Sequence, residues 1–197
     1  ELRTGLSANG MAGYANVEEK LKDSNRISNE EAIVATSFAS VFAEVSVEEA
    51  MGLGIGVMYA PEVLATDTET RAIQPSGTGD SGNQIAKAEF EDLMQLYLTL
   101  PVGDGGAYVK GGYMQMTMTT NETLATGSSY PDEDVLGLTV GLGAKGDLPY
   151  GNNLFYKVDL TYTNFDDYTA DSDSSPANKL EAELEDTALK LSVGYKF

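Results

Sequence analysis

The sequence predicts an all-β protein, an eight-stranded antiparallel up-and-down barrel formed by one domain of residues 1–197. Three observations predict this class. Apolar residues recur at every second position, as they do on one face of a β-strand. Eight such segments can be counted, and the connectors between them alternate between short and long. Even strand numbers with short turns at one rim and longer loops at the other are typical of barrels that span a membrane.

The first four segments are residues 2–16, 33–47, 51–59 and 85–100. The third is the most regular, because Leu53, Ile55 and Val57 alternate with glycines. In the fourth, one face is expected to run from Ala86 through Phe90 and Met94 to Leu100, with Asp92 interrupting it. The spacing of two, together with many glycines and β-branched residues, argues against helices.

The last four segments are residues 107–120, 136–144, 154–162 and 189–197. The first of them fits one register poorly near Tyr108 and Lys110, which suggests a β-bulge at Gly111-Gly112 that flips the phase. Met114, Met116 and Met118 follow on one face. The other three segments alternate without interruption.

The connectors are of two kinds. Residues 48–50, 101–106 and 147–153 are short turns, whereas residues 17–32, 61–84, 121–134 and 166–179 are long, polar and rich in acidic side chains. Four long acidic external loops and three short turns match the scheme of a transmembrane barrel.

Composition excludes several functions. The net charge is −19, from 31 acidic and 12 basic residues, so the phosphates of nucleic acid would be repelled. The chain has no Cys and no His, which removes thiol chemistry and the commonest general base and metal ligand. No enzymatic activity and no cofactor are expected. No stretch reaches the roughly 18 to 20 apolar residues of a membrane helix, whereas a membrane strand needs only about 9 to 11.

A soluble barrel of lipocalin type also alternates, and alternation alone does not say which face points inward. The face opposite the apolar one is rich in small residues, including Gly52, Gly54, Gly56, Gly141 and Gly143. Small residues suit a tight lumen better than a solvated exterior, so we interpret the apolar face as lipid-facing. Tyrosines near both ends of the strands suit two interfacial girdles.

The ending Val193-Gly194-Tyr195-Lys196-Phe197 resembles the carboxyl-terminal signature of outer-membrane β-barrels of Gram-negative bacteria, including OmpA-, OmpX- and OmpW-type barrels. The resemblance implies that the barrel-assembly machinery recognises this strand and that the termini lie in the periplasm, with the long loops extracellular. It implies outer-membrane lipid and lipopolysaccharide as partners. The chain would then be a mature form from which a signal peptide has been removed. The expected assembly signal is Leu189, Leu191, Val193, Tyr195 and Phe197.

An eight-stranded barrel has an interior that side chains can fill. Charges of both signs are expected on the inner face, where they should form ion pairs rather than an open pore. The expected network is Arg3, Glu44, Lys87, Glu89, Lys145, Lys157, Asp159, Asp186 and Lys190, with Glu91 and Lys196 on the same face. Phe38, Phe42, Leu93, Tyr97 and Phe155 would pack there or line an apolar passage of OmpW type.

Two non-enzymatic functions remain open. The first is a structural or surface-interaction protein with a plugged lumen; the second is a narrow channel for ions or small solutes. A weak divalent-cation site in the last long loop is a separate hypothesis, because hard oxygen ligands suit Ca²⁺ and Mg²⁺. Its candidate residues are Asp166, Asp167, Asp171 and Asp173. Their spacing does not match an EF-hand, and solvated carboxylates are the simpler interpretation.

Overall fold

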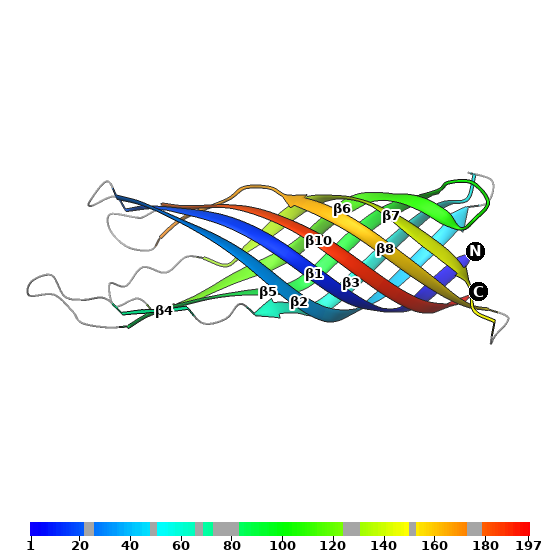
Figure 1. Ribbon diagram of the computed structural model, residues 1–197, viewed down its shortest axis with the longest axis horizontal. Helices are drawn as coiled ribbons and strands as arrows, with labels where there is room; N and C mark the ends of the chain where they lie inside the picture. Colours follow the sequence, from blue (N-terminus) through cyan, green and yellow to red (C-terminus); the bar gives the residue numbers. More distant parts are fainter. Residues whose placement is uncertain are drawn as a thin grey trace, which may run out of the picture.

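The computed structural model describes residues 1–21, 26–47, 51–65, 69–72, 83–123, 131–149, 153–172 and 179–197. Its strands are β1 (Leu2–Leu21), β2 (Arg26–Val47), β3 (Leu53–Ala65), β4 (Glu69–Ala72), β5 (Asn83–Pro101), β6 (Ala107–Thr123), β7 (Glu133–Asp147), β8 (Leu154–Phe165), β9 (Tyr168–Asp171) and β10 (Lys179–Lys196) (Figure 1). Within these ranges no helix is long and apolar enough to cross a membrane.

Eight of the strands form a closed barrel. Strands β1, β2, β3, β5, β6, β7, β8 and β10 pair antiparallel in that order, and β1 pairs with β10 from Arg3↔Lys196 to Lys20↔Lys179. Strands β4 and β9 are short pieces that pair with β5 and β10. The predicted eight-stranded up-and-down barrel is therefore confirmed. Both termini lie at the same end of the barrel, here called the terminal end; the opposite end is the distal end (Figure 1).

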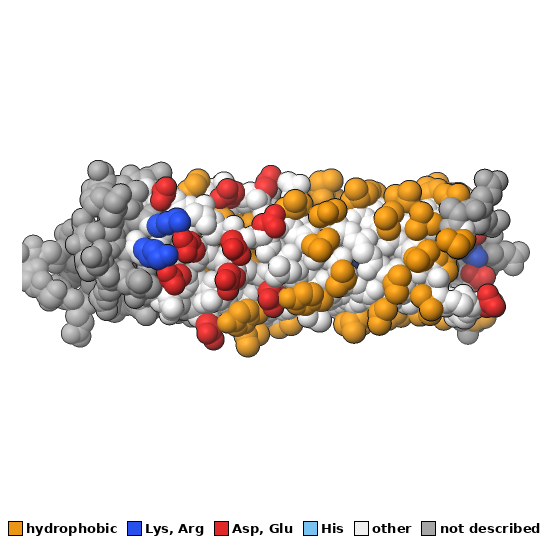
Figure 2. All heavy atoms as spheres, turned by 90° about the horizontal axis from the view of Figure 1, so that it is seen from above, with side chains coloured by type: hydrophobic (Ala, Val, Ile, Leu, Met, Phe, Trp, Pro, Cys, Tyr) orange, Lys and Arg blue, Asp and Glu red, His pale blue; other side chains and the backbone are white. Residues whose placement is uncertain are grey.

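The outer face of the barrel is apolar toward the terminal end. Leu138 is 55% exposed and Leu191 is 54% exposed, while Thr139 and Ser192 beside them are buried. Hydrophobic side chains cover this half of the visible surface, and acidic side chains gather toward the distal half (Figure 2). A barrel with its apolar face outward suits a hydrocarbon environment, which argues against a soluble lipocalin-type barrel.

The strands reach further than the sequence predicted. Strand β1 continues to Leu21, and β2 begins at Arg26, so much of the expected loop 17–32 is a paired hairpin. Continued pairing satisfies backbone N–H and C=O groups that an irregular loop would have to satisfy otherwise. Acidic residues such as Glu18 and Glu31 therefore lie on strands.

The expected bulge at Gly111-Gly112 is wrong, because β6 pairs with β7 without a register shift. The irregularity lies in β5 instead, between Glu91 and Met94, where Asp92 has a positive φ of 52°. The hydroxyl of Tyr59 donates a 2.6 Å hydrogen bond to this Asp92 carboxylate.

The bulge in β5 reverses which residues face inward. On its distal side Phe90 packs against the interior, whereas on its terminal side Leu93 is fully buried and Met94 is 58% exposed. The single face expected to join Phe90 to Met94 is therefore wrong. A bulge has this effect because one extra residue shifts a period of two by one position.

The methionines of β6 point inward, so the prediction that the apolar face of this segment is lipid-facing is wrong. Met114, Met116 and Met118 are each at most 5% exposed, while Tyr113 is 58% exposed on the outer face. Tyr108 and Lys110 are buried in the same register, so β6 alternates without interruption.

Candidate functional site: a charged lumen

The interior of the barrel contains two layers of different chemistry. Near the terminal end lies the polar layer, which we define as Arg3, Glu44, Gln95, Tyr97, Tyr108, Lys110, Lys145, Lys157, Asp159 and Lys190. Toward the distal end lies the apolar layer, which we define as Met11, Leu93, Met114, Met116, Met118, Val135, Phe165, Tyr168, Leu184 and Ala188.

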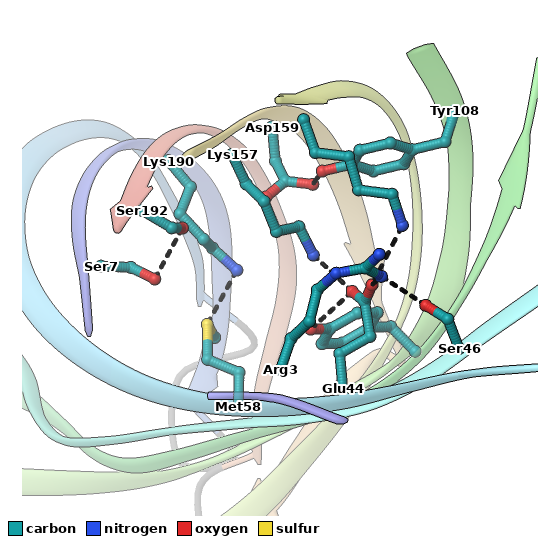
Figure 3. Close-up of polar contacts among 12 residues, drawn as sticks. Arg3, Ser7, Glu44, Ser46, Met58, Tyr108, Lys157, Asp159, Lys190 and Ser192 are labelled. Carbon is teal, nitrogen blue, oxygen red and sulfur yellow. Dashed lines mark hydrogen bonds and ion pairs between the residues drawn. The ribbon is translucent and has the colours of Figure 1, made fainter. Parts of the chain in front are cut away.

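Glu44 of β2 is the centre of the polar layer and has no exposed side-chain surface. Its Oε2 accepts hydrogen bonds from Lys157 Nζ at 2.5 Å and from the Tyr97 hydroxyl at 3.3 Å. Its Oε1 accepts from Arg3 Nη1 at 3.3 Å and from Lys145 Nζ at 3.4 Å. These donors converge on one carboxylate from four other strands (Figure 3). A buried carboxylate is tolerated only with such partners.

Glycines of β3 make room for this arrangement. A Cβ on Gly56 would overlap the ring of Tyr97, and a Cβ on Gly54 would lie 3.2 Å from Glu44 Oε1 and overlap Thr99. Alternating glycines therefore leave space for large polar side chains of the neighbouring strands, as the glycine-rich face suggested.

A second contact lies beside the first. The hydroxyl of Tyr108 donates a 2.7 Å hydrogen bond to Asp159. Lys157 lies 5.3 Å from the Tyr108 ring centroid and 5.2 Å from that of Tyr97, within range of cation–π attraction. Lys157 thus connects the Glu44 contacts to the Tyr108–Asp159 pair.

Lys110 and Lys190 have no such carboxylate partner. The Lys110 ammonium lies 3.9 Å from the Tyr97 ring centroid, and Lys190 Nζ donates to Met58 Sδ at 2.8 Å and to Gln95 Oε1 at 3.5 Å. Among the described residues no ion pair within 4.0 Å involves either lysine, although both are almost fully buried.

Uncharged hydrogen bonds also lie inside the barrel. The side-chain amide of Asn9 donates to Ser40 Oγ at 2.9 Å, and the hydroxyls of Thr139 and Thr163 lie 3.0 Å apart. Asp186 lies on β10 between Ala188 and Leu184 of the apolar layer, 4% exposed, with no hydrogen bond to its carboxylate oxygens within the described part of the chain.

The structure brings together four residues of the expected charge network, Arg3, Glu44, Lys145 and Lys157. Asp159, Asp186 and Lys190 also lie in the lumen, as separate contacts. Lys196 lies at the rim, where its Nζ pairs with Asp147 at 2.5 Å.

Two other residues of the expected inner face differ. Glu89 and Glu91 lie beyond the bulge in β5, where Phe90 packs inward, so Glu89 lies on the outer face and Glu91 is exposed. The side chain of Lys87 lies outside the described residues.

Lys110, Tyr108 and Gln95 were not predicted as parts of the polar layer. A signal for the first two existed, because Tyr108 and Lys110 share the even-numbered face of Met114 and Met116. The lipid-facing interpretation of this methionine face concealed it.

The apolar side chains expected to pack inside lie at different depths along the lumen. Phe42 and Phe155 are buried in the polar layer, with ring centroids 6.1 Å apart in an edge-on contact. Leu93 belongs to the apolar layer, and Phe38 packs partly buried against it.

The carboxyl-terminal strand faces outward along its apolar side. Leu189, Leu191, Val193, Tyr195 and Phe197 are all exposed. The backbone N–H of Phe197 donates to Leu2 O at 2.8 Å, and its ring lies 5.0 Å from that of Tyr195.

The proposed cation residues are exposed around β9, and Asp173 lies outside the described residues. Within the described part of the chain, no three acidic, His or Cys side chains are arranged to hold a metal ion.

Comparison with known proteins agrees with this architecture. The structure resembles the outer membrane protein OprG from Pseudomonas aeruginosa at 11% identity, covering 98% of this chain and 95% of that one with a TM-score of 0.55. More distant matches include Neisserial surface protein A, at 11% identity over 96% and 97% of the two chains with a TM-score of 0.43. Another is Ail of Yersinia pestis, at 11% identity over 98% and 99% with a TM-score of 0.39.

No curated protein sequence matches the chain. The family model described as "Outer membrane protein beta-barrel domain" matches residues 1–197. With a closed antiparallel barrel whose apolar face points outward, the chain belongs to the outer-membrane β-barrel protein family.

Proposed function

We propose that this outer-membrane barrel is a structural and surface-interaction protein with a closed lumen, and that it performs no catalysis. The observation that carries this proposal is Glu44, a fully buried carboxylate held by Arg3, Lys145 and Lys157 from different strands. A carboxylate bridging opposite walls obstructs the route that a solute would take.

The remaining cross-section supports a closed lumen. Tyr97, Tyr108 and Phe155 are each 2% exposed at the level of Glu44. The interior of an eight-stranded barrel is just wide enough for side chains, so three aromatic rings and an ion-paired cluster occupy much of it. Molecular recognition would then fall to the distal end.

We further propose that the terminal end faces the periplasm and the distal end faces the environment. The short turn between β5 and β6 lies at the terminal end, and the long hairpins extend from the distal end (Figure 1). Barrels of this kind have short periplasmic turns and longer external loops. The barrel-assembly machinery would recognise β10 through its outward aromatic face, which ends in Phe197.

Acidic side chains on the distal outer surface, such as Glu183 and Glu185, suit contact with lipopolysaccharide through divalent cations. Lipopolysaccharide and such cations are therefore proposed partners of the distal end, beside the lipid around the barrel.

Site-directed labelling tests the orientation, because the chain has no Cys of its own. We expect a membrane-impermeant maleimide to label Asp167→Cys, between β8 and β9, on intact cells. Asp104→Cys, in the short turn before β6, should react only after the outer membrane is permeabilised. The unmodified chain is the control, and the opposite labelling pattern would refute an exposed distal end.

A narrow channel is the second candidate, favoured by the ionic character of the plug. Contacts such as Lys145 Nζ to Glu44 at 3.4 Å can exchange partners without moving the backbone, unlike a tightly packed apolar plug. Stepwise currents through single purified barrels would favour the channel.

A further inference from the structure

Strands β2 and β3 pair over only part of their length. Among the described residues the ladder between them begins at Val47↔Leu53 and ends at Val41↔Tyr59. Strand β2 nevertheless continues to the distal end paired with β1, and β3 continues paired with β5. The distal parts of β1 and β2 lie on one side of the distal end in Figure 1, and β4 and β5 lie on the other. The wall of the barrel therefore divides beyond Val41 and Tyr59.

Alternate residues of β2 turn their backbone groups toward its two neighbours. The N–H of Ser46 donates to Glu1 O at 2.8 Å, and the amino group of Glu1 donates to Ser46 O at 3.0 Å. Hydrogen-bonded pairs recur at every second residue of an antiparallel ladder, and this ladder has no register shift, so even-numbered residues of β2 bond to β1. Odd-numbered residues turn toward the side of β3. Beyond Val41 they have no partner strand on that side within the described part of the chain, and we call them the open edge: Asn29, Glu31, Ile33, Ala35, Ser37 and Ala39.

Pro61 explains why the ladder ends where it does. Tyr59 is opposite Val41, so the next hydrogen-bonded position would place Pro61 opposite Ala39. Proline has no backbone N–H to donate to Ala39 O, and within sheets it is confined to positions that face a free edge. The open edge of β2 is therefore a consequence of the sequence.

The open edge begins where the apolar band ends. Tyr59 is 39% exposed on the outer face at the last pair of the ladder, a position typical of an interfacial tyrosine. Acidic side chains gather toward the distal end of the outer surface (Figure 2). Unpaired backbone groups are not tolerated in hydrocarbon but are tolerated in water. The open edge is therefore accessible to a water-soluble partner.

An exposed strand edge is a template for another strand. A second copy of the barrel does not fit this edge. Two barrels in one membrane have the same orientation, so their β2 strands would run in the same sense and cross at about twice the strand tilt of roughly 35 to 45°. Strands that cross so steeply cannot form a ladder. The added strand must come from a different chain.

The side chains beside the open edge define the chemistry of that strand. On the outer face Glu31 is exposed, Ile33 is 81% exposed, and Glu62 of β3 is exposed across the division. On the inner face Phe38 and Phe90 pack partly buried against the apolar layer. Successive residues of a strand point to opposite faces, so one set would meet carboxylates and the other would meet aromatic rings.

We infer that the open edge of β2 binds an extended segment of another protein, in which basic and apolar residues alternate, as an additional antiparallel strand. The backbone of the segment pairs with the odd-numbered residues of β2. Its basic side chains turn outward toward Glu31 and Glu62, and its apolar side chains turn inward toward Phe38. Binding at this edge rests on the proposed function, because it requires a distal end that faces the environment.

Residue-resolved amide hydrogen exchange of the full chain in phosphatidylcholine nanodiscs tests the site. The probe is a synthetic peptide of alternating lysine and valine, blocked at both ends. Without peptide, the amides of Ile33, Ala35 and Ser37 should exchange rapidly, whereas those of Val34 and Phe38 are protected by β1. A peptide concentration about ten times its Kd should slow the odd-numbered amides by about tenfold. Protection of the odd-numbered amides without peptide, or no change on adding it, would overturn the proposal.

Two modified peptides separate strand addition from adsorption to the acidic surface. Residues that share hydrogen bonds in an antiparallel pair carry their side chains on the same face, so the lysine amides of the peptide should face β2. Methylation of the lysine backbone nitrogens should therefore abolish binding, and methylation of the valine backbone nitrogens should not. Equal binding of the two peptides, which have the same charge, would overturn the proposal.

A pair of variants tests the edge itself. Ala35→Pro removes an N–H that faces the peptide and leaves the bonds to β1, so it should weaken binding by about tenfold, whereas Ala35→Val keeps the N–H and should bind as the wild type does. Equal affinities would contradict pairing at this edge, and the methylated peptides decide if Ala35→Pro fails to fold. Labelling of Asp167→Cys does not involve the edge. A distal end that is labelled on intact cells but does not bind the peptide would therefore refute the edge site alone.

Discussion

The polar and apolar layers fill the same barrel by different physical means. In the polar layer Glu44 is held by four named donors between 2.5 and 3.4 Å, so its position depends on charge and direction. In the apolar layer Met114, Met116 and Met118 pack with Leu93 and Phe165, where only shape and contact area matter. The two layers should therefore respond differently to the same kind of substitution.

The two layers tolerate different substitutions. A buried ion pair is damaged when one partner is removed, because the other charge remains without compensation. An apolar cluster is damaged by lost volume but tolerates an exchange of similar volume. Methionine is flexible and fills irregular gaps, which suits a lumen whose walls are fixed by the strands.

The largest effect is expected in the polar layer. Glu44→Gln should lower the free energy of unfolding by about 3 to 5 kcal/mol, because it leaves Arg3, Lys145 and Lys157 buried without their shared anion. Urea unfolding of the refolded barrel in detergent or lipid measures it. The control is Glu183→Gln on the exposed surface, which should change little. A loss below about 1 kcal/mol would remove the distinction between the layers.

In the apolar layer, side-chain volume should determine the free energy of unfolding. Met116→Ala should cost about 2 to 5 kcal/mol, whereas Met116→Leu, which keeps most of the volume, should cost less than about 1.5 kcal/mol. Met94→Ala on the outer face, 58% exposed, is the matched control and should cost less than Met116→Ala. If the Leu and Ala variants of Met116 unfolded alike, packing would not be what stabilises this layer.

The glycines of β3 show how closely the polar layer is packed. Gly56→Ala should lower the free energy of unfolding by about 1 to 3 kcal/mol. Its Cβ would overlap the ring of Tyr97 and displace the hydroxyl that donates a hydrogen bond to Glu44. Gly10→Ala is the control, since its Cβ would meet nothing nearer than Leu189 O at 4.0 Å. Equal unfolding midpoints for the two variants would show that the lumen has spare room at Tyr97.

The smallest effect is expected at the distal tips of β1 and β10, outside the apolar band. Hydrogen bonds from Lys179 and Lys20 lower the pKa of Glu181, and hydrogen bonds to Glu18 and Glu181 raise the pKa of Lys20. The Glu181 contribution is present above the ordinary carboxyl pKa of 4.5 and is lost as the pH falls through its lowered value. The Lys20 contribution is present below 10.5 and is lost as the pH rises through its raised value.

Amide hydrogen exchange at the paired distal ends of β1 and β10, corrected for the intrinsic pH dependence of exchange, should therefore show most protection between these limits. In Lys20→Gln the protection should fall slightly, and added salt should reduce the difference from the wild type. Unchanged protection in Lys20→Gln at low salt would show that these exposed pairs contribute nothing.

The fold was predictable because a period of two is a strong signal when repeated eight times with alternating connectors. The direction of the faces was also predictable from Gly54, Gly56 and Gly143, which the structure places against Thr99, Tyr97 and Tyr108. The position of the bulge was not. A single polar residue such as Asp92 does not reveal in the sequence whether it interrupts a face or shifts the register.

The site was predictable only in part. The sequence placed Arg3, Glu44 and Lys157 on one inner face, but not their convergence, because contacts across the lumen depend on strand stagger. Lys110 was missed because it shares a face of β6 with Met114 and Met116, and that apolar face was interpreted as lipid-facing. The strand extensions at the distal end were missed because polar hairpins pair without an apolar pattern.

Current through single barrels in a planar lipid bilayer tests most directly the claim that the polar layer closes the lumen around Glu44. We expect no current steps above the bare-membrane background for the wild type, with correct folding verified by heat-modifiable migration in the same sample. Steady unitary currents from folded wild-type barrels would contradict a closed lumen and identify the protein as a channel.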